Sequence, residues 1–72
     1  MHSPKIGVIG CGYWGKNLVR VFNELGYLVA VSDTTQNGRN TAKEIAPKVK
    51  ILSSLDEMLK MSVDAIVIST PA

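Results

Sequence analysis

Four short apolar runs, separated by polar stretches, are the strongest pattern along the chain. They cover residues 5–9, 28–31, 49–52 and 63–68. Each run is nearly continuous in aliphatic side chains instead of alternating with polar ones. Continuity of this kind is typical of strands that are buried on both faces of a parallel sheet. The sequence therefore predicts four buried strands.

Apolar residues at helical spacing predict a helix after the first strand, over residues 13–25. Its apolar face consists of five residues, Trp14, Leu18, Val21, Phe22 and Leu25. Gly26 follows at the position of a left-handed C-terminal cap, so we expect the helix to end there.

A polar stretch over residues 34–40 precedes the second predicted helix. It contains Asn37-Gly38, a hairpin signal, but the flanking residues are polar, whereas a hairpin needs alternating apolar ones. We therefore interpret Thr35 or Asn37 as the N-cap of a short helix that ends at Pro47. Three of its residues face inward in this interpretation, Ala42, Ile45 and Ala46.

The third predicted helix begins at Ser54, which forms an S-x-x-E capping box with Glu57. Its apolar residues Leu55, Met58 and Leu59 share one face. The whole chain then reads β-α-β-α-β-α-β, an alternation that implies a parallel sheet with right-handed crossovers. We predict an α/β fold that is the first half of a Rossmann-type doubly wound sheet, with strand order 3-2-1-4.

The loop after the first strand carries a G-x-G-x-x-G motif at Gly10, Gly12 and Gly15. The motif is informative only with a strand before it, a helix after it and an acidic residue about 20 positions on, and all three are predicted here. Gly10 allows the tight turn, Gly12 lets a pyrophosphate approach the backbone, and Gly15 lets the helix pack closely. A purely structural turn is the alternative. A methyltransferase G-x-G-x-G loop does not fit, because Trp14 stands where its third glycine belongs.

Asp33 ends the second strand, 18 positions after Gly15. A carboxylate there can accept hydrogen bonds from the adenosine ribose and would repel the 2′-phosphate of NADP, so NAD is favoured over NADP. The alternative is a solvated aspartate at a strand end. Arg39 could reach a 2′-phosphate, but it falls in the unplaced polar stretch and is more often a surface cation.

Further candidates for cofactor contacts lie at the ends of the same motif and sheet. The backbone amides of Tyr13 and Trp14 are placed to bind phosphate at the helix start. Ser69, Thr70 and Pro71 follow the fourth strand at the switch point, where ligands bind in such sheets. Cys11 is a possible nucleophile, but a small packing residue is the simpler interpretation.

Composition narrows the class of protein. With 72 residues and 46% hydrophobic content, the chain fits one small globular domain. A net charge of +2 from scattered basic residues gives no sign of nucleic-acid binding. No run approaches the roughly 20 apolar residues of a membrane span, and residues 1–5 lack a signal-peptide pattern, so we expect a cytoplasmic protein. One cysteine offers neither an internal disulfide nor a metal site.

Three segments together resemble the Gfo/Idh/MocA (glucose-fructose oxidoreductase) family. They are K-I-G-V-I-G-C-G-Y-W-G-K-N at residues 5–17, S-L-D-E-M-L at 54–59 and D-A-I-V-I-S-T-P at 64–71. The resemblance covers essentially the whole chain. The run G-Y-W-G-K-N-L at residues 12–18 is similar to the corresponding run in one branch of the family. That branch oxidises the sugar 3-hydroxyl of UDP-N-acetylglucosamine or its uronate.

The resemblance implies an NAD(P)-dependent oxidoreductase that moves hydride between nicotinamide and an alcohol of a sugar, nucleotide sugar or polyol. Members of the family continue into a catalytic Glu-Lys-Pro segment and a substrate domain, and neither occurs here. We therefore expect residues 1–72 to be a partial dinucleotide-binding domain, without catalytic residues and inactive alone, of a homo-oligomeric parent. The alternatives are a non-catalytic NAD(H)-sensing regulatory module and a flavin-binding domain.

Overall fold

The computed structural model describes residues 3–12 and 15–69 of the chain. Its strands β1 (Ile6–Ile9), β2 (Leu28–Ser32), β3 (Lys50–Leu52) and β4 (Ala65–Ile68) form one sheet. All neighbours in the sheet are parallel, and the spatial order is β3-β2-β1-β4. The predicted strand order 3-2-1-4 and the Rossmann-type half-fold are confirmed.

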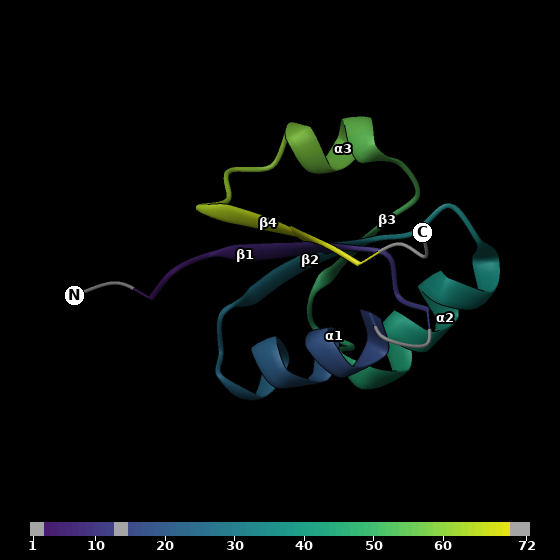
Figure 1. Ribbon diagram of the computed structural model, residues 1–72, viewed down its shortest axis with the longest axis horizontal. Helices are drawn as coiled ribbons and strands as arrows, with labels where there is room; N and C mark the ends of the chain where they lie inside the picture. Colours follow the sequence, from purple (N-terminus) through teal and green to yellow (C-terminus); the bar gives the residue numbers. More distant parts are fainter. Residues whose placement is uncertain (1–2, 13–14, 70–72) are drawn as a thin grey trace.

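Helices cover both faces of this sheet. Helices α1 (Gly15–Glu24) and α2 (Gln36–Ile45) lie together on one face, and the short α3 (Leu55–Leu59) lies on the other (Figure 1). Helix α3 lies on the other face because the chain reverses direction across the sheet after β3, to place β4 on the free edge of β1. A right-handed crossover in the reverse direction passes over the opposite face of the sheet. The carboxyl ends of β1 and β4 therefore lie at the switch point of the sheet.

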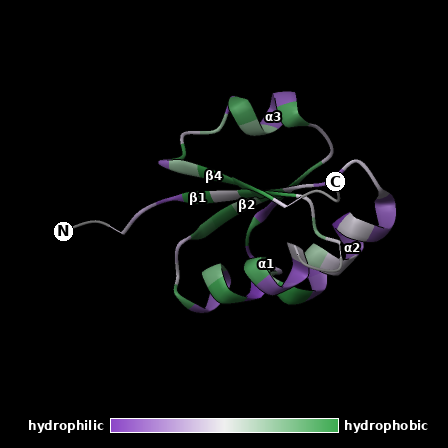
Figure 2. Cartoon of the chain, in the orientation of Figure 1, coloured by the Kyte–Doolittle hydropathy of each residue, from purple (hydrophilic) through white to green (hydrophobic). Residues whose placement is uncertain are grey.

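Two apolar clusters hold the three layers together. The strands of the sheet are mainly hydrophobic (Figure 2). The larger cluster lies between the sheet and the helices α1 and α2. Its buried members are Ile6, Val8, Cys11, Val19, Leu28, Val31, Ala42 and Ala46. The smaller cluster lies under α3 and is built on Ala30, Leu52 and Met58.

The buried face of α1 agrees only in part with the predicted one, since Phe22 packs against the larger cluster as expected but other positions differ. Val19 is fully buried, whereas Val21 and Leu25 are 45% and 54% exposed. The prediction missed this because a glycine adds nothing to a hydrophobic pattern, so the close packing of Gly15 did not enter it. Gly15 is buried against Gly10, so the face that carries Gly15 and Val19, one helical turn apart, is the one turned toward the sheet. Trp14, the first residue of the predicted face, lies outside the described residues.

The helix boundaries follow the predicted caps. Gly26 has a φ of 79° just after α1, which is the left-handed conformation expected of a C-terminal cap. Thr35 is the N-cap of α2 and accepts a hydrogen bond from the Gly38 amide, so the choice between Thr35 and Asn37 falls on Thr35. The C-cap Ala46 precedes Pro47, as predicted.

Ser54 caps the third helix as predicted, but the backbone amide that donates back to Glu57 is that of Ser53, and the helix buries less than predicted. Ser54 accepts a hydrogen bond from the Glu57 amide, and Glu57 accepts in turn from the amide and hydroxyl of Ser53. Of the expected apolar face only Met58 is buried, and Leu55 and Leu59 are 50% and 61% exposed. A five-residue helix makes little more than one turn, so one side chain carries its contact with the sheet.

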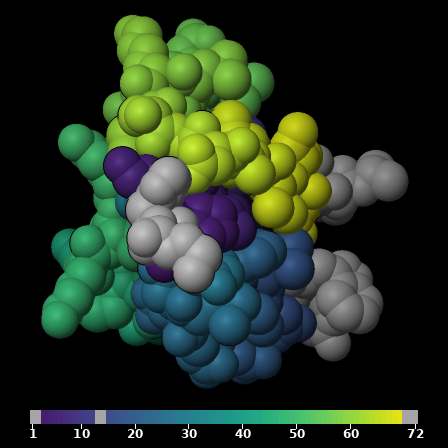
Figure 3. Space-filling model, turned by 90° about the vertical axis from the view of Figure 1, so that its left-hand side faces the viewer, coloured from purple at the N-terminus to yellow at the C-terminus, as the bar shows by residue number. Residues whose placement is uncertain are grey.

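That contact depends on Gly7 in the middle of β1. A Cβ atom at Gly7 would lie 2.5 Å from the Met58 sulfur, so the absence of a side chain lets α3 approach the sheet. Among the described residues, strand β4 pairs with β1 alone, and its burial is incomplete. Seen from the amino-terminal end of the strands, β4 lies at the surface beside the α3 layer (Figure 3). Ile68 on this strand is 68% exposed.

Within the described ranges, no helix is both long enough and apolar enough to cross a membrane.

Candidate functional site

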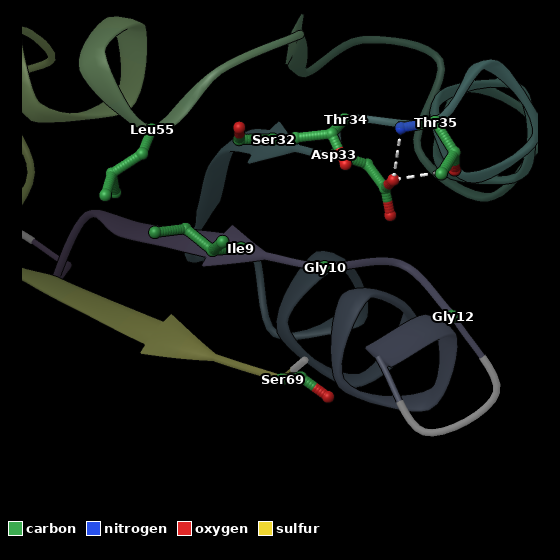
Figure 4. Close-up of a pocket in the computed structure, with 9 residues that line it drawn as sticks. All are labelled: Ile9, Gly10, Gly12, Ser32, Asp33, Thr34, Thr35, Leu55 and Ser69. Carbon is green, nitrogen blue, oxygen red and sulfur yellow. Dashed lines mark hydrogen bonds between the residues drawn. The ribbon is translucent and has the colours of Figure 1, made fainter. Parts of the chain in front are cut away.

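A pocket of about 390 Å³ opens at the carboxyl ends of β1, β2 and β4. This volume lies within the roughly 300–1,000 Å³ that is usual for small-molecule sites. The pocket is lined by Ile9, Gly10, Gly12, Ser32, Asp33, Thr34, Thr35, Leu55 and Ser69 (Figure 4). Four of the residues predicted as site residues, Gly10, Gly12, Asp33 and Ser69, are thus brought together around one cavity.

The glycine loop owes its path to Gly10 and Gly15. Gly10 has a φ of 96°, a conformation that residues with side chains rarely adopt. Its amide donates a hydrogen bond of 2.8 Å to the Ser32 carbonyl, which keeps the loop attached to β2. A Cβ atom at Gly15 would overlap the Gly10 carbonyl, 2.8 Å from its carbon, so only glycine allows α1 to begin so close to the strand.

Gly12 has the opposite environment. No other part of the described chain lies within 4 Å of the place where its Cβ would be. The Gly12 carbonyl accepts a hydrogen bond of 3.0 Å from the Lys16 amide, so the first turn of α1 is built directly on this residue. The start of a helix carries roughly half a positive charge, which favours anions. Among the described residues, Gly12 therefore leaves open space at a helix end whose partial charge favours anions.

Asp33 lies across the pocket from the glycine loop. Its Oδ2 accepts a hydrogen bond of 2.8 Å from the Cys11 amide. Its Oδ1 accepts from the Thr35 amide over 2.8 Å and from the Thr35 hydroxyl over 2.7 Å. A carboxylate has about four acceptor sites. Three are used by these donors, so among the described residues one acceptor site, on Oδ2, has no donor.

The surroundings of Asp33 keep it ionised. Partial burial by itself would raise the pKa of this carboxyl, but the hydrogen bonds from Cys11 and Thr35 act in the opposite direction, and so does the charge of Arg39. Together they hold the pKa below its ordinary value of 3.8. Asp33 therefore carries a full negative charge at neutral pH, the state in which it accepts hydrogen bonds from ribose hydroxyls and repels phosphate.

The Cys11 side chain belongs to the core and not to the pocket. It is only 3% exposed and packs in the larger apolar cluster. Burial raises the pKa of its thiol, the negative charge of Asp33 raises it further, and Lys16 offsets only part of the effect. A protonated thiol is a poor nucleophile. The packing interpretation of Cys11 therefore agrees with the structure.

Ser69 continues the line of β4 into the pocket rim. Its amide donates a hydrogen bond of 2.8 Å to the Ile9 carbonyl, so the residue after β4 stays attached to β1. A Cβ atom at Gly15 would lie 3.4 Å from the Ser69 hydroxyl oxygen, which places this hydroxyl beside the start of α1. The other predicted residues, Tyr13, Trp14, Thr70 and Pro71, lie outside the described residues.

Arg39 differs from its expected position. It lies on α2 and not in a loop. Its guanidinium donates to the Asp33 carbonyl oxygen over 2.9 Å and to the Gln36 side chain over 3.1 Å. In this arrangement Arg39 holds the backbone that follows β2.

Sequence reasoning missed five lining residues, Ile9, Ser32, Thr34, Thr35 and Leu55, and had given two of them, Thr35 and Leu55, other roles. Thr35 was considered only as a helix cap, although an Asp followed two residues later by Thr is a common pattern for a local side-chain hydrogen bond. Leu55 was assigned to the buried face of α3. Its exposed side chain instead reaches toward the same space as Ile9 (Figure 4).

The described residues contain no group of three or more His, Cys, Asp or Glu side chains that could hold a metal ion.

Comparison with known proteins agrees with this geometry. The model of an oxidoreductase family with an NAD-binding Rossmann fold matches residues 4–72. Among solved structures, the chain is similar to the WlbA dehydrogenase from Bordetella pertussis, in complex with NADH and UDP-GlcNAcA, with a TM-score of 0.84 and 30% identity. The match covers 97% of this chain and 22% of WlbA, so the chain spans less than a quarter of that protein's length. No curated protein matches the sequence significantly.

Proposed function

Since this chain belongs to the Gfo/Idh/MocA family of oxidoreductases, as its NAD-binding Rossmann domain, we propose that it binds NAD for a dehydrogenase acting on a sugar or nucleotide sugar. Bound nicotinamide would supply the acceptor for a hydride from a substrate alcohol. The residues of this chain would hold and orient the dinucleotide. On this proposal residues 1–72 are one part of a longer homo-oligomeric enzyme and are not catalytic alone.

The observation that carries the proposal is the pairing of Gly12 with Asp33 across one pocket. Gly12 leaves open space at the start of α1, where backbone amides favour a diphosphate. Asp33 offers a fixed, ionised carboxylate with one acceptor site left for a ribose hydroxyl. A diphosphate and an adjacent ribose are the two parts of a dinucleotide that such a pair recognises.

The remaining site residues take roles that follow from their places in the chain. We propose that the amides of Tyr13 and Trp14 complete the phosphate cradle that begins at Gly12. Ser69 would line the nicotinamide side of the cleft, together with Thr70 and Pro71, because ligands of doubly wound sheets lie beyond the carboxyl ends of the strands.

Preference for NAD over NADP is part of the proposal. The 2′-phosphate of NADP carries up to two negative charges and would replace the hydroxyl that Asp33 accepts from. Arg39, a cation whose charge acts on Asp33, donates hydrogen bonds to the Asp33 carbonyl oxygen and to Gln36. Binding of NADP would therefore need two changes at once: removal of the Asp33 carboxylate charge and release of the Arg39 guanidinium from its hydrogen bonds.

The substrate class rests on the family and on one neighbour. The similar WlbA dehydrogenase is in complex with a nucleotide sugar as well as NADH. We infer that the enzyme containing this chain takes a nucleotide sugar or a related sugar alcohol, with the catalytic and sugar-binding groups supplied outside residues 1–72.

Calorimetric titration of the complete enzyme with NAD and with NADP tests the cofactor proposal. We expect binding of NAD and binding of NADP that is at least tenfold weaker. Equal affinity would contradict the role of Asp33, and binding of neither would contradict the proposed function. A spectrophotometric NADH assay of the complete enzyme with a panel of nucleotide sugars and free polyols tests the activity. NAD binding without turnover of any of them would favour the NAD(H)-sensing alternative.

A further inference from the structure

The first turn of α2 is built around the Asp33 carboxylate. Thr35 donates to Oδ1 of Asp33 twice, from its amide and from its hydroxyl. The same hydroxyl oxygen accepts a hydrogen bond of 3.0 Å from the Gly38 amide. The dashed contacts in Figure 4 join Asp33 to this turn. Thr35 thus links the helix cap to the acid at the end of β2.

Gly38 is the second unusual feature of this turn. It lies inside α2, and its φ is not in the left-handed region, so its conformation does not require glycine. A Cβ atom at this position would overlap the Asp33 carboxyl group, 2.7 Å from Oδ1 and closer still to Oδ2 and the carboxyl carbon. Glycine inside a helix normally lowers stability relative to alanine. Close approach of the carboxylate is the physical reason for glycine here.

These contacts fix the position of the carboxylate from two sides. The Cys11 amide holds Oδ2 from the glycine loop, and Thr35 holds Oδ1 from α2. If the α2 contacts were lost, the side chain could rotate and the free acceptor site on Oδ2 would no longer point in one direction. A ribose hydroxyl is bound more tightly when that direction is fixed before the ligand arrives, because no ordering cost is then left for binding.

We propose that Thr35 and Gly38 are positioning residues that set the orientation of Asp33, and with it the preference of the site for a ribose with a free 2′-hydroxyl. The inference rests on the proposed function and deepens it. Thr35 acts through its hydroxyl, and Gly38 acts by leaving room for the carboxylate. Two substitutions, Thr35→Val and Gly38→Ala, separate these two contributions.

Thr35→Val keeps the shape and the backbone amide but removes the hydroxyl. We expect NAD affinity to fall about tenfold, the factor typical of one hydrogen bond to a charged group, with little change for NADP. Thr35→Ser restores the hydroxyl and should restore NAD affinity. Ser54→Ala is the matched control, because Ser54 caps α3 in the same way without contacting Asp33. It should lower stability to a similar degree and leave NAD affinity unchanged.

The titration of Asp33 provides a readout that needs no cofactor. Carboxyl-detected NMR of the chain should find the pKa of Asp33 below 3.8 in the wild type, higher in Thr35→Val, and low again in Thr35→Ser. Arg39 on α2 and the Cys11 thiol of the glycine loop are the other titratable groups that influence this carboxyl or feel its charge, and neither is changed by these substitutions. An unchanged pKa in Thr35→Val would overturn the role of Thr35.

Gly38→Ala tests the space beside the carboxylate. We expect at least fivefold weaker NAD binding, because the new methyl group displaces either the carboxylate or the helix turn. Asn37→Ala, at the exposed neighbouring position of the same turn, is the control and should leave affinity unchanged. If Gly38→Ala bound NAD as tightly as the wild type and melted at a higher temperature, as an ordinary helical Gly→Ala change does, the role of Gly38 would be wrong.

A double-mutant cycle separates positioning from direct contact, since Thr35 also lines the pocket. In an Asp33→Ala background, Thr35→Val should have no further effect on NAD affinity. A full tenfold loss in that background would mean that Thr35 contacts the nucleotide itself, which overturns the inference. Failure of the complete wild-type enzyme to bind NAD would contradict the proposed function instead, and the NMR titration would still decide the role of Thr35.

Discussion

The backbone amide of Cys11 donates a hydrogen bond of 2.8 Å to Oδ2 of Asp33, across 22 positions of sequence. It joins the glycine loop after β1 to the acid after β2. The donor belongs to a residue that is only 3% exposed. Asp33 therefore has two tasks: it is the proposed ribose acceptor, and it holds the glycine loop in place.

The first prediction follows from this double task. Asp33→Ala should weaken NAD binding and also lower the free energy of unfolding by about 1–3 kcal/mol, because the buried Cys11 amide loses its acceptor. It should not convert the site to tight NADP binding, since the loop itself is disturbed. Chemical denaturation and calorimetry with both dinucleotides measure the two effects.

Asp64→Ala is the matched control for this prediction. Asp64 also accepts a backbone hydrogen bond, of 2.8 Å from the Lys5 amide, but at an exposed position at the other end of the sheet. Its loss should cost less than about 1 kcal/mol and leave cofactor affinity intact. Strong NADP binding by Asp33→Ala at unchanged stability would contradict the loop-holding role.

The second prediction separates two glycines of the same motif. Gly15→Ala should lower stability by about 1–3 kcal/mol, because its methyl group meets the rigid Gly10 carbonyl. Gly12→Ala should change stability by no more than about 0.5 kcal/mol, since its methyl group meets open space. Both should reduce NAD affinity, Gly12→Ala by obstructing the phosphate. Thermal melts combined with NAD titration distinguish the two.

Gly7→Ala provides a control that lies away from the pocket. Its methyl group would meet the Met58 side chain, whose flexible end can move, so we expect a small loss of stability and no loss of cofactor binding. Equal melting temperatures for the Gly12→Ala and Gly15→Ala variants would show that the close approach at Gly15 is not needed.

The third prediction concerns the stability of the fold at low pH. A carboxyl whose pKa is lower in the folded than in the unfolded chain stabilises the fold above its unfolded pKa, and this contribution is lost as pH falls through the folded pKa. Asp33 and Glu57 both have lowered pKa values, relative to 3.8 and 4.5, and for Glu57 the cause is hydrogen bonding from Ser53 and Ser54. Stability should therefore be level above about pH 5 and decline below it.

Urea unfolding at several pH values, with the variants Asp33→Asn and Glu57→Gln, measures this dependence. Each variant should show a shallower decline between about pH 4.5 and pH 2 than the wild type. A decline that begins near pH 7 would implicate other groups, and identical slopes in all three proteins would contradict the assignment to these carboxyls.

The fourth prediction concerns the edge strand β4. In the described chain β4 pairs only with β1, and Ile68 on it is 68% exposed. Exposed apolar edges promote association of strands between molecules. We expect the 72-residue chain to self-associate at micromolar concentration and Ile68→Lys to reduce the association. Sedimentation velocity gives the measurement.

Val21→Lys is the control, because Val21 is 45% exposed but lies on α1 and not on the sheet edge. It should leave the association unchanged. A cooperative, well-folded wild-type monomer at the same concentration would contradict the prediction.

Much of the fold could be predicted from local patterns. Each strand is a nearly continuous apolar run, and the helix ends carry the residues that end helices, such as Gly26 in a left-handed conformation and Ser54 bonded to the Glu57 amide. These signals act over a few residues, so the chain displays them without its tertiary structure. The alternation of elements and the handedness of crossovers predict a parallel sheet, and the strand order follows once the fold is taken as the Rossmann type of doubly wound sheet.

Which face each helix buries could not be predicted in the same way. Apolar spacing favoured Val21 and Leu25 on α1, yet the contact of Gly15 with Gly10 turns Val19 inward. On α3, the gap above Gly7 admits Met58 and leaves Leu55 exposed at the pocket. A glycine contributes nothing to a hydrophobic pattern, although it decides how closely two elements approach.

The sequence by itself determined the order of the elements, the glycine loop and the acid at the end of β2, because backbone conformation and caps depend on neighbouring residues. Only the tertiary structure decided that Asp33 is held between Cys11 and Thr35, and that Arg39 lies on α2 with its guanidinium on the Asp33 carbonyl oxygen. Contacts of this kind depend on distances of closest approach between packed elements, and those distances arise only when the layers come together.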